Sequence, residues 1–465
     1  MYRGGGTWGS ILASVQVDSI GKECLAAGHS YLYKDILPVG FLGLVDDIIG
    51  VTEAGVKAQK MNSFINLKTA EKTLQFGPTK CKTMLVGKNV KNVINSGLLV
   101  DEWVTNYVEN IHTGEAEMVE KYTGQTEIEN VTEQKYLGFV LSSTGDNMAN
   151  IKEIKKKSIG IVRTTLNKLN SLHLKNYYFE CSVILMNVMI RSSILYASDM
   201  YYQLKENELR QLERIEESYL RQVLKTTKGC PINQLYLCLG QYPARFEIQK
   251  MRMLYLKYLL HEKQTSLLYK FFTLQLEQPT KGDWVSTCLN DLKELRISHT
   301  FDEIKLMSKN QFSKLLKERS RENAFKYLID KQGSKGSEII YSDLSMSDYL
   351  LPTNSELTVE EKQHLFAVKT RMTNIPSNYP KPEVKYICLC GQSEDMRHIY
   401  ICEVINEGKQ PNLKYENIYT GNISQQIEVF RKFETNLERR TELTNKNFPR
   451  DPCVIHCPRQ SIVMG

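Results

Sequence analysis

Short apolar runs mark the first strands of the predicted fold. Residues 39–51 read Val-Gly-Phe-Leu-Gly-Leu-Val-Asp-Asp-Ile-Ile-Gly-Val, so two carboxylates, Asp46 and Asp47, separate two apolar runs of strand length. The β-branched residues that follow favour a second strand. This pattern predicts a hairpin with both carboxylates at its turn. Residues 54–74 then predict a helix and residues 80–87 a returning strand, an order typical of a small α+β layer.

Helical spacing dominates the rest of the chain. Apolar residues recur with this spacing over residues 151–174, 176–203, 206–225, 244–262, 285–295, 308–329 and 360–372. The most apolar segment, 181–202, is interrupted by Asn187, Arg191 and Asp199, which predicts a buried helix and no membrane span. The Met, Leu and Tyr residues of 244–262 predict a helix that is buried on most sides. The fold class predicted from these patterns is α+β, with antiparallel strands and helices first and a mainly helical remainder.

Changes in composition divide the chain into four segments. Residues 1–145 hold the mixed pattern, and residues 146–330 are helical. Residues 331–405 open with a polar stretch, 331–337, of linker composition, followed by a helix and a group of Cys and His residues. Residues 406–465 are polar and lack a persuasive apolar period, so we expect a loosely ordered tail.

Composition describes an ordinary globular protein. The 465 residues are 42% hydrophobic and 24% charged, which allows a sizeable core. The net charge of +7 permits an anionic partner without requiring one. No signal peptide opens the chain, so the eleven Cys are expected to be reduced in an intracellular compartment, cytoplasmic or nuclear. Clustered thiols are therefore interpreted as metal ligands.

Three thiols and an imidazole form one such cluster: Cys388, Cys390, His398 and Cys402. A Cys₃His set is what zinc needs for a closed tetrahedral site, and the His-x-x-x-Cys half fits one helical turn. The Cys-x-Cys half is tighter than usual, so a distorted site or a site with only three of these ligands remains open. Ordinary buried thiols are the other interpretation. The tail offers a second small set at Cys453, His456 and Cys457.

Two further features favour anionic ligands. The helix predicted at 151–174 has one strongly basic face, opposed only by Glu153; its cations include Lys152, Lys155, Lys156, Lys157 and Arg163. Such a face either follows a nucleic-acid backbone or is merely solvated. The glycine-rich stretch at 4–10, which leads into a helix at Ile11, either lets the backbone approach a phosphate or serves chain geometry alone.

The two adjacent carboxylates suit a hard divalent cation, because Mg²⁺ prefers oxygen ligands and is held by one or two carboxylates with substrate phosphates. Aspartate is also common in turns that bind nothing. The order of motifs resembles the palm of reverse transcriptases from non-LTR (LINE-like, jockey-type) retrotransposons. The matching stretches are 4–10, 44–47, 76–82, and 135–138 (Lys-Tyr-Leu-Gly) with 142–145. The Cys/His group resembles the motif that ends many of these reading frames.

The resemblance implies RNA-directed DNA synthesis by two-metal nucleotidyl transfer, with an RNA template, a DNA primer, deoxynucleoside triphosphates, Mg²⁺ or Mn²⁺, and no membrane. Asp46 would be the magnesium ligand, with Asp47 beside it. The residues implied to lie near template or nucleotide are Gly5, Gly6, Ser10, Lys80 and Lys82. Residues 1–145 would be a partial palm, 146–330 a thumb and connection region, and 331–405 a zinc knuckle.

The family's first catalytic aspartate lies upstream of the glycine loop, on a strand that this chain does not contain. We therefore expect this chain to be inactive alone as a polymerase. The alternative is a zinc-containing nucleic-acid-binding protein without catalysis, which would use the basic helices at 152–175 and 308–329 together with the Cys/His group.

Overall fold

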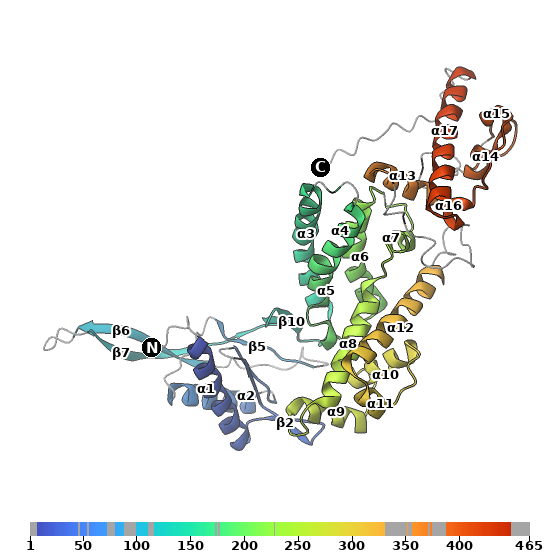
Figure 1. Ribbon diagram of the computed structural model, residues 1–465. Coiled ribbons are helices and arrows are strands. Elements are labelled where there is room, and N and C mark those ends of the chain that lie inside the picture. The colour runs from blue at the N-terminus through green and yellow to red at the C-terminus, as the bar shows by residue number, and fades with distance from the viewer. Residues whose placement is uncertain are drawn as a thin grey trace. The chain divides into compact units, whose positions relative to one another are not determined.

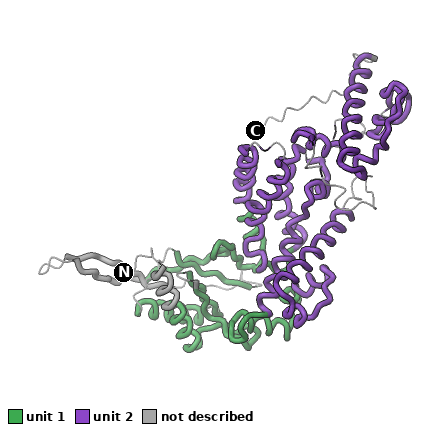
Figure 2. The backbone as a smooth tube through the Cα atoms, in the orientation of Figure 1, with its two compact units in different colours: residues 1–154, 201–204, 261–286 green, residues 155–200, 205–260, 287–465 purple. Residues whose placement is uncertain are grey.

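The computed structural model describes two compact units, and each is treated separately. It describes residues 7–44, 47–53, 55–71, 80–87, 99–109, 116–172, 174, 177–226, 228–330, 351, 356–370, 373 and 387–447, with only the backbone at 7–16, 44, 99–109 and 116–124. Unit 1 combines Met1–Ile154 with Tyr201–Leu204 and His261–Ser286 (Figure 2). Unit 2 combines Lys155–Met200, Lys205–Leu260 and Thr287–Gly465.

Unit 1 contains helices and two-stranded sheets (Figure 1). Its helices are α1 (Thr7–Ala26), α2 (Val56–Glu71) and α9 (Leu267–Glu277). The antiparallel pairs are β1 (Tyr31–Tyr33) with β2 (Leu37–Val39), β3 (Phe41–Leu44) with β4 (Asp47–Gly50), β6 (Leu99–Glu109) with β7 (Ala116–Glu127), and β9 (Glu133–Tyr136) with β10 (Phe139–Ser142). The parallel pair is β5 (Lys82–Thr83) with β8 (Glu129–Asn130). The mixed class predicted from the sequence is confirmed.

Glycine allows α1 to pack closely against β3. A Cβ on Gly43 would lie 2.4 Å from Cγ1 of Val17, and one on Gly21 would lie 2.7 Å from Cδ1 of Phe41. Neither distance is possible for a real Cβ, so only glycine permits this approach. The buried residues beside it come from both α1 and α2: Ile20, Cys24, Met61 and Ile65. The two helices thus support the β3–β4 hairpin.

Helix α9 folds with unit 1, although the sequence placed it in the helical segment 146–330. Leu274 of α9 is buried with Leu37 and Val39 of β2. The rings of Tyr33 and Phe271 lie 4.8 Å apart. This packing joins chain segments far apart in sequence, so local periodicity gives no sign of it.

Unit 2 is helical in its described part. Its helices are α3 (Met148–Ser171, which begins in unit 1), α4 (Tyr178–Leu185), α5 (Ser192–Leu195), α6 (Glu206–Val223), α7 (Ile232–Cys238), α8 (Ala244–His261), α10 (Trp284–Glu294, which also begins in unit 1), α11 (Phe301–Leu306), α12 (Lys309–Asp330), α13 (Val359–Lys369), α14 (Met396–Ile401), α15 (Glu403–Asn406), α16 (Asn417–Thr420) and α17 (Ile423–Asn447). A π-helical turn, η3 (Met186–Arg191), joins α4 to α5, and a 3₁₀ turn, η4 (Ser198–Met200), follows. Helices are confirmed at the positions that the apolar spacing predicted, with ends shifted by up to three residues, except that the stretch predicted at 176–203 ends at Leu195.

The apolar segment predicted to be a buried helix is buried on one face only. Met186 and Ile190 lie inside, whereas Ile184 and Val188 are 58% and 64% exposed. The window Tyr178–Leu195 is long and apolar enough to cross a bilayer, a test that core helices also pass, and 33% of it is buried. Its Arg191 forms an internal ion pair, which is the arrangement a buried charge needs.

That ion pair joins η3 to α6 and α8. Nε of Arg191 donates to Glu216 at 2.7 Å, and the same carboxylate accepts from the Tyr236 hydroxyl at 3.0 Å and from the Ala244 N–H at 2.9 Å. Burial raises the pKa of Glu216, and the Arg191 charge opposes that rise. The polar residue that interrupts the apolar pattern is therefore part of the core.

The expectation of a loosely ordered tail is wrong for residues 406–447. Helix α17 runs for 25 residues and buries Phe430 and Phe433. Two of its buried positions are held by the polar residues Gln426 and Asn436, which interrupt the apolar period that would predict the helix. The second Cys/His set, at Cys453, His456 and Cys457, lies outside the described residues.

Candidate metal centres and nucleic-acid surface

The hairpin predicted around the two carboxylates is confirmed. Strands β3 and β4 pair antiparallel, with Leu44 opposite Asp47. Only Val45 and Asp46 lie between these partners, and both lie outside the described residues. Asp47 is exposed at the start of β4. An exposed carboxylate at a strand end, supported by packed helices, provides a hard oxygen ligand of the kind Mg²⁺ takes.

The Lys-Tyr-Leu-Gly stretch lies in a second hairpin, in which β9 pairs antiparallel with β10. Its turn residues Leu137 and Gly138 have φ of 47° and 85°, the left-handed pair that a two-residue hairpin turn requires. Burial raises the pKa of Tyr136, and the charge of Asp47 adds to the rise. The structure therefore brings Tyr136 within electrostatic range of Asp47.

The other residues predicted near a nucleotide have different outcomes. Gly5 and Gly6 lie outside the described residues. Ser10 belongs to α1, which begins at Thr7. Lys82 pairs its ammonium group with Glu129 of the neighbouring strand, so contact with a triphosphate would require this pair to open. Lys80 is exposed.

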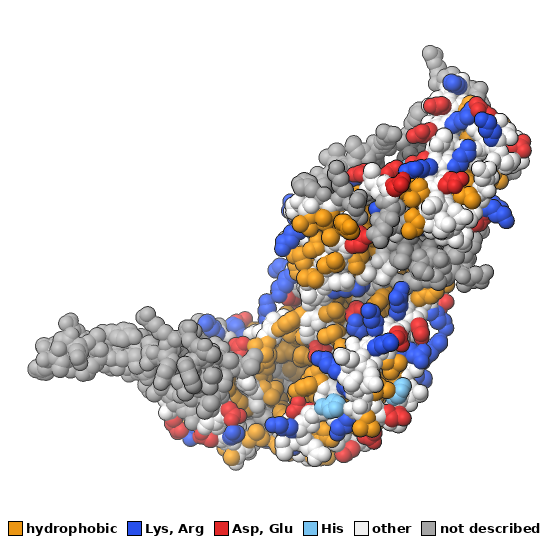
Figure 3. Space-filling view, in the orientation of Figure 1, with side chains coloured by type: hydrophobic (Ala, Val, Ile, Leu, Met, Phe, Trp, Pro, Cys, Tyr) orange, Lys and Arg blue, Asp and Glu red, His pale blue; other side chains and the backbone are white. Residues whose placement is uncertain are grey.

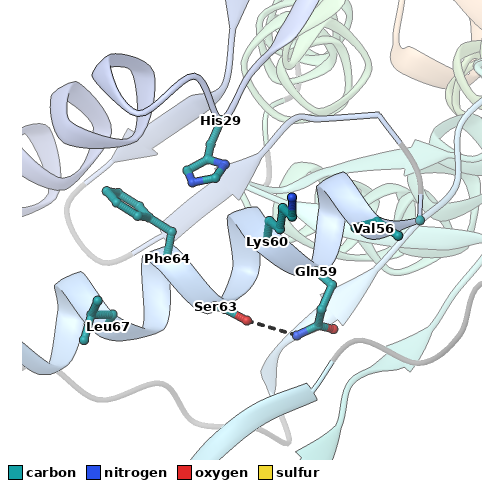
Figure 4. A pocket seen from close by; sticks show the side chains of 8 residues that line it. His29, Val56, Gln59, Lys60, Ser63, Phe64 and Leu67 are labelled. Atoms are coloured by element: carbon teal, nitrogen blue, oxygen red, sulfur yellow. Dashed lines mark hydrogen bonds between the residues drawn. The ribbon is translucent and has the colours of Figure 1, made fainter.

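A pocket of about 570 Å³ lies beside α2 in unit 1 (Figure 4). Its lining consists of His29, Gly55, Val56, Gln59, Lys60, Ser63, Phe64 and Leu67. The His29 and Phe64 rings lie 4.9 Å apart. None of the predicted site residues lines this pocket. Its lining also lacks a carboxylate, the side chain through which proteins usually hold Mg²⁺.

The basic helix is confirmed as α3, and its cations are not evenly distributed. All five predicted cations are exposed: Lys152, Lys155, Lys156, Lys157 and Arg163. With 3.6 residues per turn, four of them share one side and Lys157 lies on another, near Lys168. A third side, between these two, is buried through Ile151, Ile154, Val162 and Leu169.

The one acidic residue of α3 contacts a cation of another element. Glu153 lies 3.6 Å from the ammonium group of Lys135, outside the helix. The remaining surface of α3 presents positive charge along one line, and this is the property that a phosphate backbone recognises.

A tight turn presents the first two thiols of the Cys/His group. Ile387 forms a β-bridge with Ser393, and the Cys388 N–H donates to the Gln392 carbonyl at 2.8 Å. Gly391 has φ of 85°, which lets the chain reverse directly after Cys390. The turn places both thiols on the side that faces α14.

Helix α14 presents the other two ligands. Its N-cap, Asp395, accepts the His398 N–H at 2.6 Å, and the Cys402 N–H donates to the His398 carbonyl at 2.7 Å. His398 and Cys402 are therefore one turn apart on one face, as their spacing predicted.

The four ligand atoms converge. They all lie within 4.8 Å of one another, with Cys388 Sγ 3.7 Å from Cys402 Sγ and Cys390 Sγ 3.1 Å from His398 Nε2. Tetrahedral zinc with Zn–S bonds of about 2.3 Å places two sulfurs about 3.8 Å apart. Burial raises the pKa of the Cys388 thiol to about 12. The whole Cys₃His set, and not a subset of three, can hold a metal ion such as zinc.

Sequence reasoning missed the residues of α17 that hold this group. Asn436 and Arg440 contact the turn and helix that carry the ligands. Asn436 lies one helical turn after Phe433, so it occupies the same face as a large buried ring. The signal in the sequence was Asn436 itself, a polar residue at a position that belongs to the apolar face of a helix.

Comparison with models of known protein families, with curated proteins and with solved structures finds no match. The features established are a mixed, mostly helical α+β chain and a Cys/His group able to bind a metal. A function must therefore be argued from these residues and their geometry.

Proposed function

We propose that this chain is part of an RNA-directed DNA polymerase of the non-LTR retrotransposon type, which acts on an RNA template and a DNA primer. The observation that carries the proposal is the β3–β4 hairpin. Its second strand begins at Asp47, its first strand packs on α1 through glycine contacts, and the Tyr136 hairpin lies within range of Asp47. These elements follow one another along the chain in the same order as the motifs on which the resemblance to reverse transcriptases rests.

In this proposal Asp46 and Asp47 hold Mg²⁺ or Mn²⁺. The bound cation supplies charge stabilisation to the in-line transfer of a nucleotide to a primer hydroxyl. The chain's own contribution is to fix the strands that flank the carboxylates, because Gly43 and Gly21 let α1 support the hairpin directly. Tyr136 lies within electrostatic range of Asp47.

The basic side of α3 positions the nucleic acid. Its cations spread over about 16 Å from Lys152 to Arg163, at a helical rise of about 1.5 Å per residue. Contacts of this kind go to phosphates and carry no sequence information. The protein therefore binds primer–template duplexes of any sequence through α3.

The test combines binding with primer extension. Fluorescence anisotropy with a labelled RNA–DNA duplex measures affinity, and extension of the DNA strand on RNA measures nucleotide transfer in Mg²⁺ and Mn²⁺. Extension is assayed on the chain and on a longer polypeptide that includes the coding sequence upstream of Met1. Incorporation that Asp46→Asn abolishes supports the proposal, because a neutral amide cannot balance the cation.

The second candidate is a zinc-containing nucleic-acid-binding protein without catalysis. It is favoured by the two features whose side chains the structure describes fully, the Cys₃His group and the exposed cations of α3. Tight duplex binding without any incorporation by either polypeptide would select this candidate over the polymerase.

A further inference from the structure

Asn436 of α17 lies in a cage of backbone carbonyls from the ligand-bearing segment. Its Nδ2 donates to the Ile399 carbonyl at 3.1 Å and to the Tyr400 carbonyl at 2.9 Å. The residue is 1% exposed. These carbonyls belong to the last turn of α14, between the ligands His398 and Cys402, and the end of a helix leaves such carbonyls without internal partners. Asn436 thus fixes the helix that orients two of the four ligands.

Asn406 extends the same contact. Its Nδ2 donates to the carbonyls of Tyr400 and Cys402, both at 3.0 Å, while its Oδ1 lies 3.2 Å from Nδ2 of Asn436. The network ends on the backbone of Cys402, itself a ligand. Buried amides connected in this way specify one arrangement, because breaking any member leaves buried polar groups unpaired.

Arg440 holds the residue that precedes the N-cap of α14. Its guanidinium donates from Nε to Glu394 at 3.0 Å and from Nη2 at 2.8 Å, a bidentate pair. The Glu394 side chain is 4% exposed and precedes the cap residue Asp395. One turn of α17, from Asn436 to Arg440, therefore contacts both sides of the segment that carries the metal ligands.

An apolar layer completes this attachment. The Tyr415 ring lies 5.8 Å from Tyr400 of α14 and 6.2 Å from Phe433 of α17. Figure 1 shows α17 running beside α14, α15 and α16. The segment 387–402 is too short to bury a core of its own, so its folding depends on both metal and α17.

The charge of this module does not suit a phosphate backbone. Residues 387–447 contain nine acidic and eight basic side chains, and Figure 3 shows them mixed over this part of the molecule. Three of its arginines are already paired, Arg397 with Glu416, Arg439 with Glu407 and Arg440 with Glu394. Affinity for nucleic acid depends on an excess of cations near phosphates, which α3 presents, whereas the charges of this module nearly balance.

We propose that metal binding to the Cys/His group fixes residues 387–402 against α17, with Asn436 and Arg440 as positioning residues, and that nucleic acid is contacted elsewhere. We call this metal-dependent attachment the clamp. Residues around a metal site that orient its ligands typically change affinity ten- to a hundredfold when replaced. The clamp depends on the metal site but not on the polymerase reaction.

The experiment uses the full chain with zinc and with Co²⁺ in its place. The variants are Asn436→Leu and Arg440→Met, with Arg439→Met as the matched control, because Arg439 pairs with Glu407 at the surface of the same helix. Zinc affinity is measured by competition with a chromophoric chelator, and ligand geometry by the Co²⁺ absorption spectrum. Hydrogen exchange follows α17 before and after chelation, and Cys402→Ser repeats the metal loss without a chelator.

Asn436→Leu and Arg440→Met should lower zinc affinity by roughly ten- to a hundredfold and alter the Co²⁺ spectrum, with Arg439→Met unchanged. Chelation should expose the amides of α17 and leave those of α6 and α8 protected. Binding to the RNA–DNA duplex should not change on chelation. Wild-type zinc affinity in both variants, a protected α17 in zinc-free protein, or a chelator-dependent loss of duplex binding would each overturn the clamp. A chain that binds no nucleic acid contradicts the polymerase and leaves the zinc and exchange measurements to decide the clamp.

Discussion

The distribution of charge on α3 gives the sharpest test of nucleic-acid binding. Lys156 and Arg163 share the basic side of the helix, whereas Lys157 and Lys168 lie on a different side. Replacing either pair with Ala removes two positive charges from exposed positions. The two variants therefore have equal net charge and differ only in which side of α3 they change.

The expected effect follows from counterion release. Each phosphate contact contributes about 0.9 to the slope of log affinity against log salt for a duplex. Loss of two contacts should lower that slope by about 1.8 and weaken binding roughly 30-fold near physiological salt. Long-range attraction alone would reduce affinity equally in both variants.

Anisotropy titrations of an RNA–DNA duplex at several salt concentrations measure both quantities. Lys156→Ala/Arg163→Ala should show the full loss for duplexes of unrelated sequence, and Lys157→Ala/Lys168→Ala a much smaller one. Equal losses, or an unchanged slope in the first variant, would show that the basic side of α3 is merely solvated.

Three other changes test the fold and the metal site. Gly43→Val should destabilise unit 1 by about 1–3 kcal/mol in urea unfolding, because the new side chain meets α1. Gly160→Ala, on the open side of α3, is the control and should not destabilise the protein. Equal stability of Gly43→Val and wild type would contradict the close packing. Arg191→Met should lower the free energy of unfolding by about 3–5 kcal/mol in the same assay, because Glu216 stays buried without its partner. A double variant that removes both charges should recover stability, and a single variant no less stable than the double one would refute this. Zinc binding should release at least the proton of Cys388, because burial raises the pKa of this thiol to about 12 and the thiol is protonated at neutral pH. Zinc affinity should therefore fall as the pH is lowered. Calorimetry in buffers of different ionisation heat measures the released protons, and a result of none would exclude Cys388 as a ligand.

Local patterns predicted the parts of this molecule that depend on local geometry. The hairpin at Asp47 follows from apolar runs of strand length, and the turn at Gly138 follows from its backbone preference. The approach of His398 and Cys402 follows from a four-residue spacing on a helix. Convergence of the Cys388–Cys390 pair with the His398–Cys402 pair needed the reverse turn at Gly391.

Features that depend on distant contacts were missed. Helix α9 packs against β2 from more than two hundred positions along the chain, so its own period places it in the wrong segment. The Lys82 ammonium is paired with Glu129, a partner that no spacing rule specifies. Helix α17 was overlooked because Asn436 breaks its apolar period. This polar side chain is buried because it donates a hydrogen bond to the Tyr400 carbonyl of α14.

RNA-templated primer extension tests the central claim most directly. The polypeptide that includes the coding sequence upstream of Met1 should add deoxynucleotides to a DNA primer on an RNA template in Mg²⁺ or Mn²⁺. Asp46→Asn should abolish this activity while leaving duplex affinity within about twofold of wild type, because phosphate contacts elsewhere supply the affinity. Full activity in Asp46→Asn, or tight duplex binding with no incorporation by the longer polypeptide, would contradict the polymerase assignment.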